Sequence, residues 1–176
     1  MTRIFLGLGV VALSGCVSLN PVTMVQLARL DPLTADPTQM AVALDLPEGV
    51  GVAEGSAHMR LYADHQDGAG FDERFELVQS AQDVWRVEPG AQDRFRAAQA
   101  RALAWEQADA DAASGGFSVG FEPCTLDAGP GADARVSLSL QLEPGARFLP
   151  LFNEVPVTAF MEDADLAALR PCGSAD

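Results

Sequence analysis

A serine at the centre of the segment GFSVG, residues 116–120, is the most obvious nucleophile in this sequence. The Gly-x-Ser-x-Gly pattern is typical of a nucleophile elbow, in which a strand, a sharp turn and a helix expose the hydroxyl. Here apolar residues alternate with small or polar ones through the segment, which predicts an ordinary strand. The two histidines, His58 and His65, both precede the serine, whereas the histidine of an elbow fold follows it. We expect Ser118 to be a strand hydroxyl, and the alternative is a serine hydrolase that uses Ser118 with His58 or His65.

Metal binding is the second chemistry that these residue types could support. His58 and His65 are seven residues apart, the first on a predicted strand and the second in a predicted loop with Asp64 and Asp67. The ligands of a metal must converge on one point, which a strand followed by a loop does not ensure. The acidic stretches ADADAAS and MEDADL lack the alternating ligands, the glycine and the distant glutamate of a calcium loop. We therefore expect no catalytic, cofactor or metal site, with a metal-handling protein as a further alternative.

Cys16 stands at the end of a segment with a different chemistry. The start MTR supplies the positive charge of Arg3, and the apolar run from Ile4 to Leu13 is half the length of a membrane span. The run ends in LSGC, residues 13–16. This segment resembles the signal peptide and lipobox of bacterial lipoproteins at all four lipobox positions. The resemblance covers only residues 1–16 and leaves the family of the remaining chain open.

The resemblance implies that residues 1–15 are a signal peptide, removed by cleavage between Gly15 and Cys16. The Cys16 thiol would then carry a diacylglyceryl group, and the new amino terminus would be acylated. Because each buried methylene contributes about 0.8 kcal/mol, two or three acyl chains hold a protein at a membrane almost permanently. Val17 stands where lipoproteins of the inner membrane often carry aspartate. We expect an envelope protein anchored in the outer membrane and facing the periplasm.

The two other cysteines, Cys124 and Cys172, would lie in an oxidising compartment if the chain is exported. We expect them to form a disulfide. The loop that it closes has about 49 residues, for which the chain-entropy relation gives about 4 kcal/mol of stabilisation. Two free thiols are the alternative.

The charge of the chain limits its partners. It has eleven arginines and no lysine, so amine chemistry such as a Schiff base is excluded. Without residues 1–15 it carries 25 acidic and 10 basic residues, a net charge of −15. Such a surface repels phosphate backbones, so we expect no nucleic-acid partner. The expected partners are the membrane, through the lipid on Cys16, and another envelope protein.

Alternating apolar residues predict several half-buried strands, and their wet outer faces are typical of antiparallel sheets. The segment before them, residues 16–37, is interpreted as lipid anchor and tether, with a short apolar docking segment from Met24 to Leu30. The predicted strands are 40–46, 57–63, one through Phe75 and Leu77, 84–87, 117–121, 135–142 and 155–160, and a loop rich in glycine and aspartate covers 63–73.

One long helix is predicted between Ala91 and Ala113, because apolar residues recur there every three to four positions. Ser114, Gly115 and Gly116 are interpreted as its stop signal. A short helix is predicted over 163–169. The expected fold is α+β but mainly β, an antiparallel sheet or sandwich with one long helix packed across it, and residues 38–176 are expected to form a single globular domain. The predicted inward face of the long helix consists of Phe95, Ala98, Ala102 and Trp105.

Overall fold

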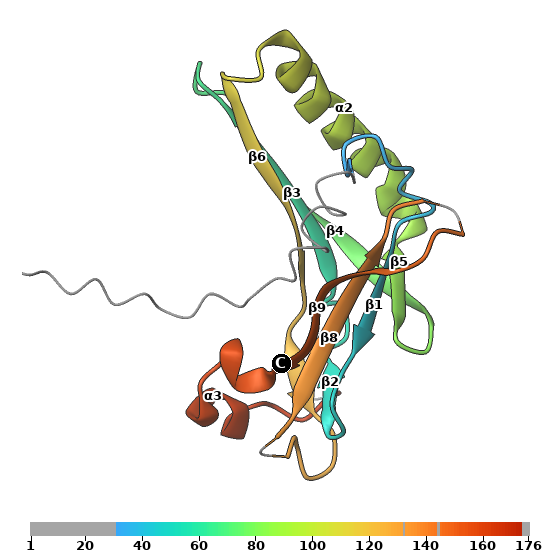
Figure 1. The fold of residues 1–176 in the computed structure, drawn as a ribbon, viewed down its shortest axis with the longest axis vertical. Coiled ribbons are helices and arrows are strands. Elements are labelled where there is room, and N and C mark those ends of the chain that lie inside the picture. The colour runs from blue at the N-terminus through green and yellow to red at the C-terminus, as the bar shows by residue number, and fades with distance from the viewer. Residues whose placement is uncertain (1–30, 132, 144, 174–176) are drawn as a thin grey trace, which may run out of the picture.

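The computed structural model describes residues 31–131, 133–143 and 145–173, and these form a curled antiparallel sheet with a long helix packed against it (Figure 1). The sheet has seven strands in the order β6-β3-β4-β5-β1-β8-β9. The mainly β, α+β class expected from the sequence is confirmed. The strands are β1 (Ala41–Asp45), β2 (Val50–Val52), β3 (His58–His65), β4 (Gly70–Ala81), β5 (Val84–Val87), β6 (Ala113–Gly120), β7 (Pro123–Thr125), β8 (Arg135–Gln141) and β9 (Leu149–Pro156). The helices are η1 (Pro89–Ala91), α2 (Gln92–Ala108), η2 (Val157–Ala159) and α3 (Asp163–Ala167).

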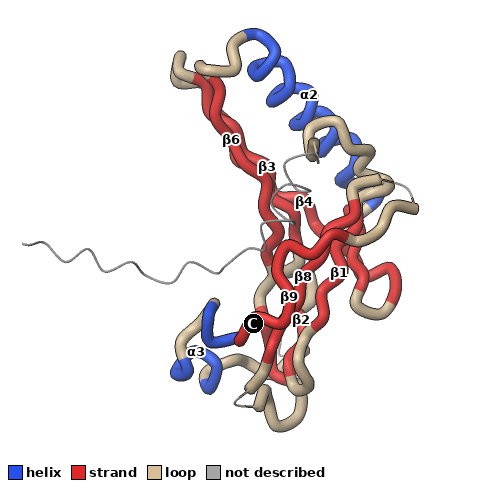
Figure 2. The backbone as a smooth tube through the Cα atoms, in the orientation of Figure 1, coloured by secondary structure: helices blue, strands red, loops and turns tan. Residues whose placement is uncertain are grey.

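The middle of the sheet is built from partners that are distant in the chain. β1 lies between β5 and β8, and Ala41 pairs with Arg86 on one side and with Gln141 on the other. β3 similarly lies between β4 and β6. β6 and β9 are the two edge strands of the sheet. Figure 2 shows α2 beside the upper part of the strands and α3 beside their lower part.

The hydrophobic core occupies the inner face of the curl, on the side covered by α2. Met59, Leu61 and Phe75 are almost completely buried there. Phe95 of α2 packs its ring 4.4 Å from that of Phe75. The predicted apolar face of the helix is correct, since Phe95, Ala98 and Ala102 are buried and Trp105 is half-buried. Alanines on this face allow the helix to approach the sheet closely.

A small second sheet lies at the end of the molecule opposite the C-terminal end of α2 (Figure 1). It consists of β2 and β7, in which Gly51 pairs with Cys124. The expected disulfide is present and joins Cys124 to Cys172, with 5.0 Å between the Cα atoms. The chain after β9, including α3, is thereby fixed to the strand that follows β6.

The predicted C-terminal end of the long helix is wrong. α2 ends at Ala108, and the glycines taken as its stop signal lie within β6, which begins at Ala113. The reason is a close approach to β3, because a Cβ at Gly115 would lie 2.5 Å from the Tyr62 carbonyl oxygen. Glycine is therefore required by packing between strands and not by a helix cap.

Two other segments differ from the predicted pattern. The predicted loop over 63–73 is mostly strand, because β3 continues to His65 and β4 starts at Gly70. The strand predicted over 155–160 lies earlier, at Leu149–Pro156, and is followed by a 3₁₀ turn. Local alternation was weak in both segments, and pairing with neighbouring strands decides their structure.

Candidate functional site

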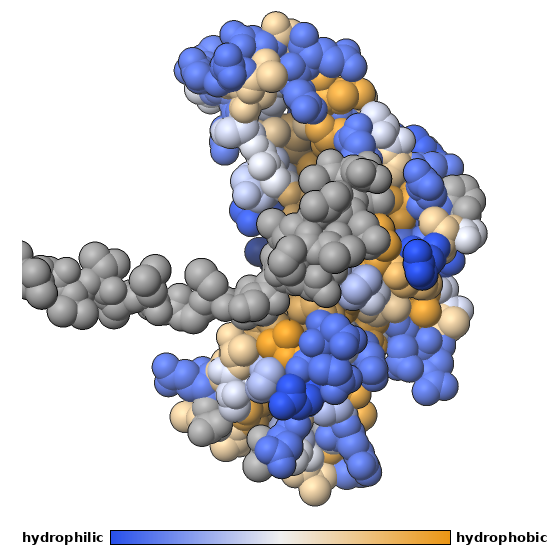
Figure 3. Space-filling model, in the orientation of Figure 1, coloured by the Kyte–Doolittle hydropathy of each residue, from blue (hydrophilic) through white to orange (hydrophobic). Residues whose placement is uncertain are grey.

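An apolar groove runs along β6 on the inner side of the curl. It consists of three adjoining hollows of about 470, 200 and 320 Å³. Pro32 and Phe117 line both the first and the second hollow, and Val119 lines both the second and the third. The shared walls make the three hollows one feature. Figure 3 shows apolar surface between the α2 layer and the β6 layer, where the first hollow lies.

β6 forms one wall of the groove along its whole length. The side chains of Phe117 and Val119 share a face with Leu61 and Met59, because these residues are direct cross-strand partners. Both side chains are only half-buried, although they pack against the core. Half-buried apolar side chains that point into a hollow supply contact surface for an apolar group.

The facing wall comes from the opposite end of the sheet. Leu140 and Leu142 of the β8 segment and Leu151 of β9 line the middle hollow. Phe152 of β9 lines the third hollow, and its ring lies 5.0 Å from that of Phe160, which is 51% exposed. The third hollow is the most apolar of the three and is completed by Leu166 and Leu169 in and after α3.

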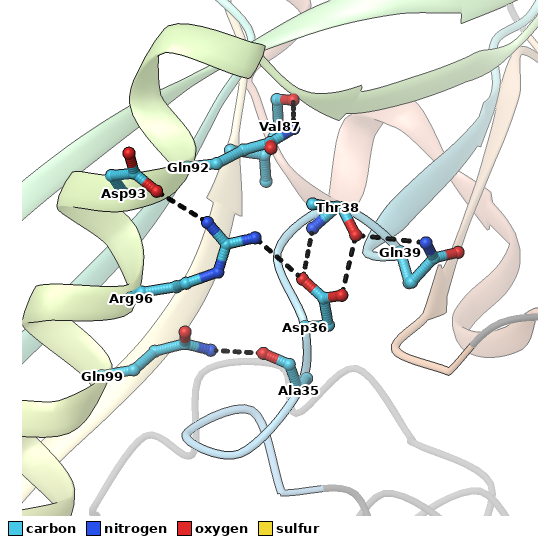
Figure 4. A network of polar contacts seen from close by, with 9 residues as sticks. All are labelled: Ala35, Asp36, Thr38, Gln39, Val87, Gln92, Asp93, Arg96 and Gln99. Atoms are coloured by element: carbon cyan, nitrogen blue, oxygen red, sulfur yellow. Dashed lines mark hydrogen bonds and ion pairs between the residues drawn. The ribbon is translucent and has the colours of Figure 1, made fainter.

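The upper wall is formed by α2 together with the segment 31–39, which contains the described part of the predicted tether. The Gln99 amide is only 3% exposed, and its Nε2 donates hydrogen bonds to the carbonyl oxygens of Pro32 (2.6 Å) and Ala35 (2.9 Å). Figure 4 shows Gln99 reaching from the helix to this segment. The bond fixes Pro32 at the junction of the first and second hollows.

A carboxylate reinforces the same contact between helix and segment (Figure 4). Asp36 accepts hydrogen bonds from the backbone N–H and the hydroxyl of Thr38, at 3.0 and 2.8 Å. It also pairs with Arg96 of α2, at 3.2 Å. The Thr38 bonds and the guanidinium lower the pKa of Asp36 below its ordinary value. The segment is therefore held by a buried amide and by an exposed ion pair.

The outer face of the sheet behind the groove is polar. Arg60 of β3 forms a bidentate pair with Asp72 of β4, at 2.7 and 2.6 Å, and this pair lowers the pKa of the Asp72 carboxyl. The Arg60 guanidinium also lies 4.6 Å from the centre of the Tyr62 ring. Tyr62 in turn leans over Gly116, where a Cβ would lie 2.5 Å from the phenol oxygen. Aromatic cover of this kind stabilises a glycine in an edge strand.

The structure brings Ser118 and His58 near each other without forming a catalytic pair. Ser118 is opposite Arg60, and His58 is opposite Gly120, so the serine and the histidine are diagonal neighbours on the outer face. Diagonal positions on adjacent strands are about 7–8 Å apart along the backbone, and within the described residues no hydrogen bond joins the Ser118 hydroxyl to the His58 ring. The Nδ1 atom of His58 lies 2.8 Å from the Ser56 carbonyl oxygen. Ser118 lies inside a continuous strand, as the sequence predicted.

The other candidate residues have structural contacts. His65 lies at the end of β3, 5.8 Å from the Trp105 ring, and its Nδ1 is 3.0 Å from Asp67. Trp105 also packs 5.8 Å from Phe71, in agreement with its predicted packing role. Within the described residues, no group of three or more histidines, cysteines or acids is placed to hold a metal ion.

Sequence reasoning missed Gln99 and the far wall of the groove. Gln99 was detectable, because it lies four positions after Phe95 and three before Ala102, on the apolar stripe of the helix. A polar side chain there has to find a partner. The meeting of β6 with Leu140 and Leu151 was not detectable, since it depends on the order of the strands in the sheet.

Comparison with known proteins adds no family. No protein-family model, no curated protein and no solved structure matches the chain. Cys16 and the lipobox-like segment lie outside the described residues. In the part of the chain that is described, no helix is long and apolar enough to cross a membrane.

Proposed function

We propose that this protein is a lipid-anchored component of the bacterial cell envelope that binds another molecule through the groove beside β6. The observation that carries the proposal is the mainly apolar lining of the second and third hollows, in which residues of β6 and residues of β8 and β9 from the other end of the sheet line the same space. The ligand is apolar, or presents apolar groups, because the second and third hollows are lined mainly by aliphatic and aromatic side chains. The role is binding or envelope assembly and not catalysis.

The lipid anchor on Cys16 is the second part of the proposal. Its support is the lipobox-like LSGC segment after a short apolar run. A disulfide between Cys124 and Cys172 fits an oxidising compartment, and the net charge of −14 disfavours attraction of the chain to anionic lipids. Attachment would therefore depend on the acyl chains, with the protein at the outer membrane and facing the periplasm.

Binding to the groove can be measured with a neutral fluorescent apolar dye, N-phenyl-1-naphthylamine, added to the full-length protein. We expect saturable fluorescence enhancement that Val119→Asp reduces strongly, because Val119 lines two of the hollows. The matched control is Val78→Asp, since Val78 is an exposed valine outside these hollows. Equal dye binding by both variants would remove the groove from the proposal.

The anchor is tested by fractionation of cells that express the protein. Cys16→Ser, or treatment with globomycin, should leave an unprocessed precursor and change its membrane distribution. Processing and fractionation that match those of the wild-type chain would exclude lipid attachment at Cys16.

A hydrolase remains the alternative function, and the diagonal placement of Ser118 and His58 is the observation in its favour. Labelling of Ser118 by a fluorophosphonate probe, abolished in both Ser118→Ala and His58→Ala, would support it. Absence of labelling in the wild-type protein would leave binding as the function.

A further inference from the structure

The free edge of β6 presents a regular row of backbone groups. The Gln66 N–H donates to the Ala112 carbonyl at 2.9 Å, which sets the phase of the hydrogen bonds between β3 and β6. In an antiparallel pair, every second residue bonds the partner and the alternate residues point away. In β6, the backbone N–H and C=O groups that point away from β3 belong to Ala113, Gly115, Phe117 and Val119.

These outward groups have no hydrogen-bond partner within the described part of the chain. β6 contains no proline and no charged residue over its eight positions. Natural edge strands are usually disrupted by such residues, by bulges or by a covering element. β6 instead pairs with β3 without a register shift along its whole length. Its edge therefore has the geometry that accepts another strand.

The groove lies where an added strand would place half of its side chains. Phe117 and Val119 have both properties. Their backbone N–H and C=O groups are directed away from β3, and the two residues also line the groove. A residue paired with either one directs its side chain to the same face. Every second side chain of the added strand would then contact Leu140 and Leu151 in the second hollow.

Acidic residues flank both ends of this uncharged edge. Asp109 and Asp111 are exposed in the turn before β6, and Asp64 is exposed opposite Ser114. At the other end, Glu122 is exposed just after the strand, and its carbonyl bonds the Ala53 N–H beside Glu54. These charges favour a partner segment with basic residues at both ends.

We infer that β6 binds an extended polypeptide segment of another envelope protein by strand addition, with alternating apolar side chains in the groove and basic residues at its ends. The inference rests on the proposed function and names its ligand class. A second copy of this chain is a poorer fit. Pairing two β6 strands antiparallel brings the acidic end of each against the acidic end of the other, and the whole chain has a net charge of −14.

The test uses a fluorescent peptide of eight residues, the length of β6, with arginine at each end and valine alternating with threonine between. Anisotropy is measured with the full-length protein. We expect saturable binding, which falls about tenfold when the arginines are replaced by glutamates. The side chains of the valines face the groove, and their backbone N–H groups donate to β6. N-methylation of the valines removes these hydrogen bonds and should weaken binding by about a hundredfold. N-methylation of the threonines should leave it unchanged.

Two substitutions at one position give the matched test in the protein. Val119→Pro removes an outward N–H that is not used in the sheet, and Val119→Ala removes only side-chain surface. Val119→Pro should bind the peptide about tenfold more weakly than Val119→Ala. Circular dichroism should show both variants folded, because proline is tolerated where an edge N–H faces away from the sheet.

Three results would overturn strand addition. The first is equal binding of the valine-methylated and unmodified peptides. The second is saturable dye binding with no peptide binding, which would assign the groove to a small apolar ligand and leave the proposed function standing. The third is a dimer in sedimentation equilibrium that Val119→Pro dissociates, which would assign the edge to a second copy. If the wild-type protein bound neither the dye nor the peptide, the proposed function itself would be overturned.

Discussion

The two edges of the sheet are built differently. β9 contains Pro150 and Pro156, its pairing with β8 shifts register twice, and Glu154 has a backbone φ of 51°. β6 has none of these features and keeps its register with β3 from end to end. Proline, bulges and strained backbone are the means by which proteins prevent unwanted pairing at an edge. Their presence on one edge only indicates that the chain protects β9 and leaves β6 regular.

The two edges are also held differently by the rest of the molecule. The chain after β9 folds back as α3 and is fixed by the disulfide to β7, which follows β6. β6 is supported from behind by Tyr62 over Gly116 and on its inner side by α2. The two edges are therefore held by different features, namely the disulfide, the β6 glycines and the contacts of α2. Each of these can be altered separately.

Removing the disulfide should have the largest effect. The double substitution of Cys124 and Cys172 by alanine should lower the free energy of unfolding by about 4 kcal/mol, because the unfolded chain regains the freedom of a long loop. Urea denaturation measures the change. The wild-type protein under reducing conditions is the control and should match the variant. A loss below about 1 kcal/mol would contradict the entropic stabilisation expected from this disulfide.

Glycine substitutions in β6 should come next. Gly115→Ala should destabilise the protein by about 1–3 kcal/mol, because the new Cβ would meet backbone atoms of Tyr62 and Ala63. Gly116→Ala is the matched control and should cost less, since the atoms nearest to its Cβ belong to the movable phenol of Tyr62. Thermal and urea unfolding compare the two. The reverse order would mean that the close approach of β6 to β3 is not what requires glycine.

The contact between α2 and the segment that carries Pro32 should be weaker still. Gln99→Leu should lower the free energy of unfolding by about 1–2 kcal/mol, because two carbonyl oxygens lose their donor. It should also weaken dye binding, since Pro32 lines the groove. Gln107→Leu, at an exposed position of the same helix, serves as the control for both measurements. Unchanged dye binding in Gln99→Leu would separate this wall from the site.

The smallest effect is expected from the Asp36 carboxylate. Its folded-state pKa is lowered, so the stability it contributes is present above the unfolded value near 3.9 and is lost as pH falls through the folded pKa. Melting temperatures below about pH 4 should therefore fall less steeply in Asp36→Asn than in the wild-type protein. Asp111→Asn, at an exposed carboxylate, is the control. Equal slopes in Asp36→Asn and the wild-type protein would contradict the role of the Thr38 and Arg96 contacts.

Local patterns predicted much of this fold. The alternation in β1, β3 and β8 and the spacing of Phe95, Ala98 and Ala102 in α2 identified the buried faces. The glycines at 115 and 116 were misread because a helix stop and a close strand contact use the same residue type. The groove and the free edge of β6 could not be derived, because they follow from which strand ends the sheet. That order is set by contacts between residues far apart in the chain.

The position of β1 has a consequence for how the protein reaches this fold. Ala41 is synthesised 100 residues before Gln141, which is one of its two partners. The centre of the sheet thus stays incomplete until β8 is available, and such distant pairing makes folding slow. Until then β1 has an unsatisfied side, and we expect the nascent chain to need shielding from premature association.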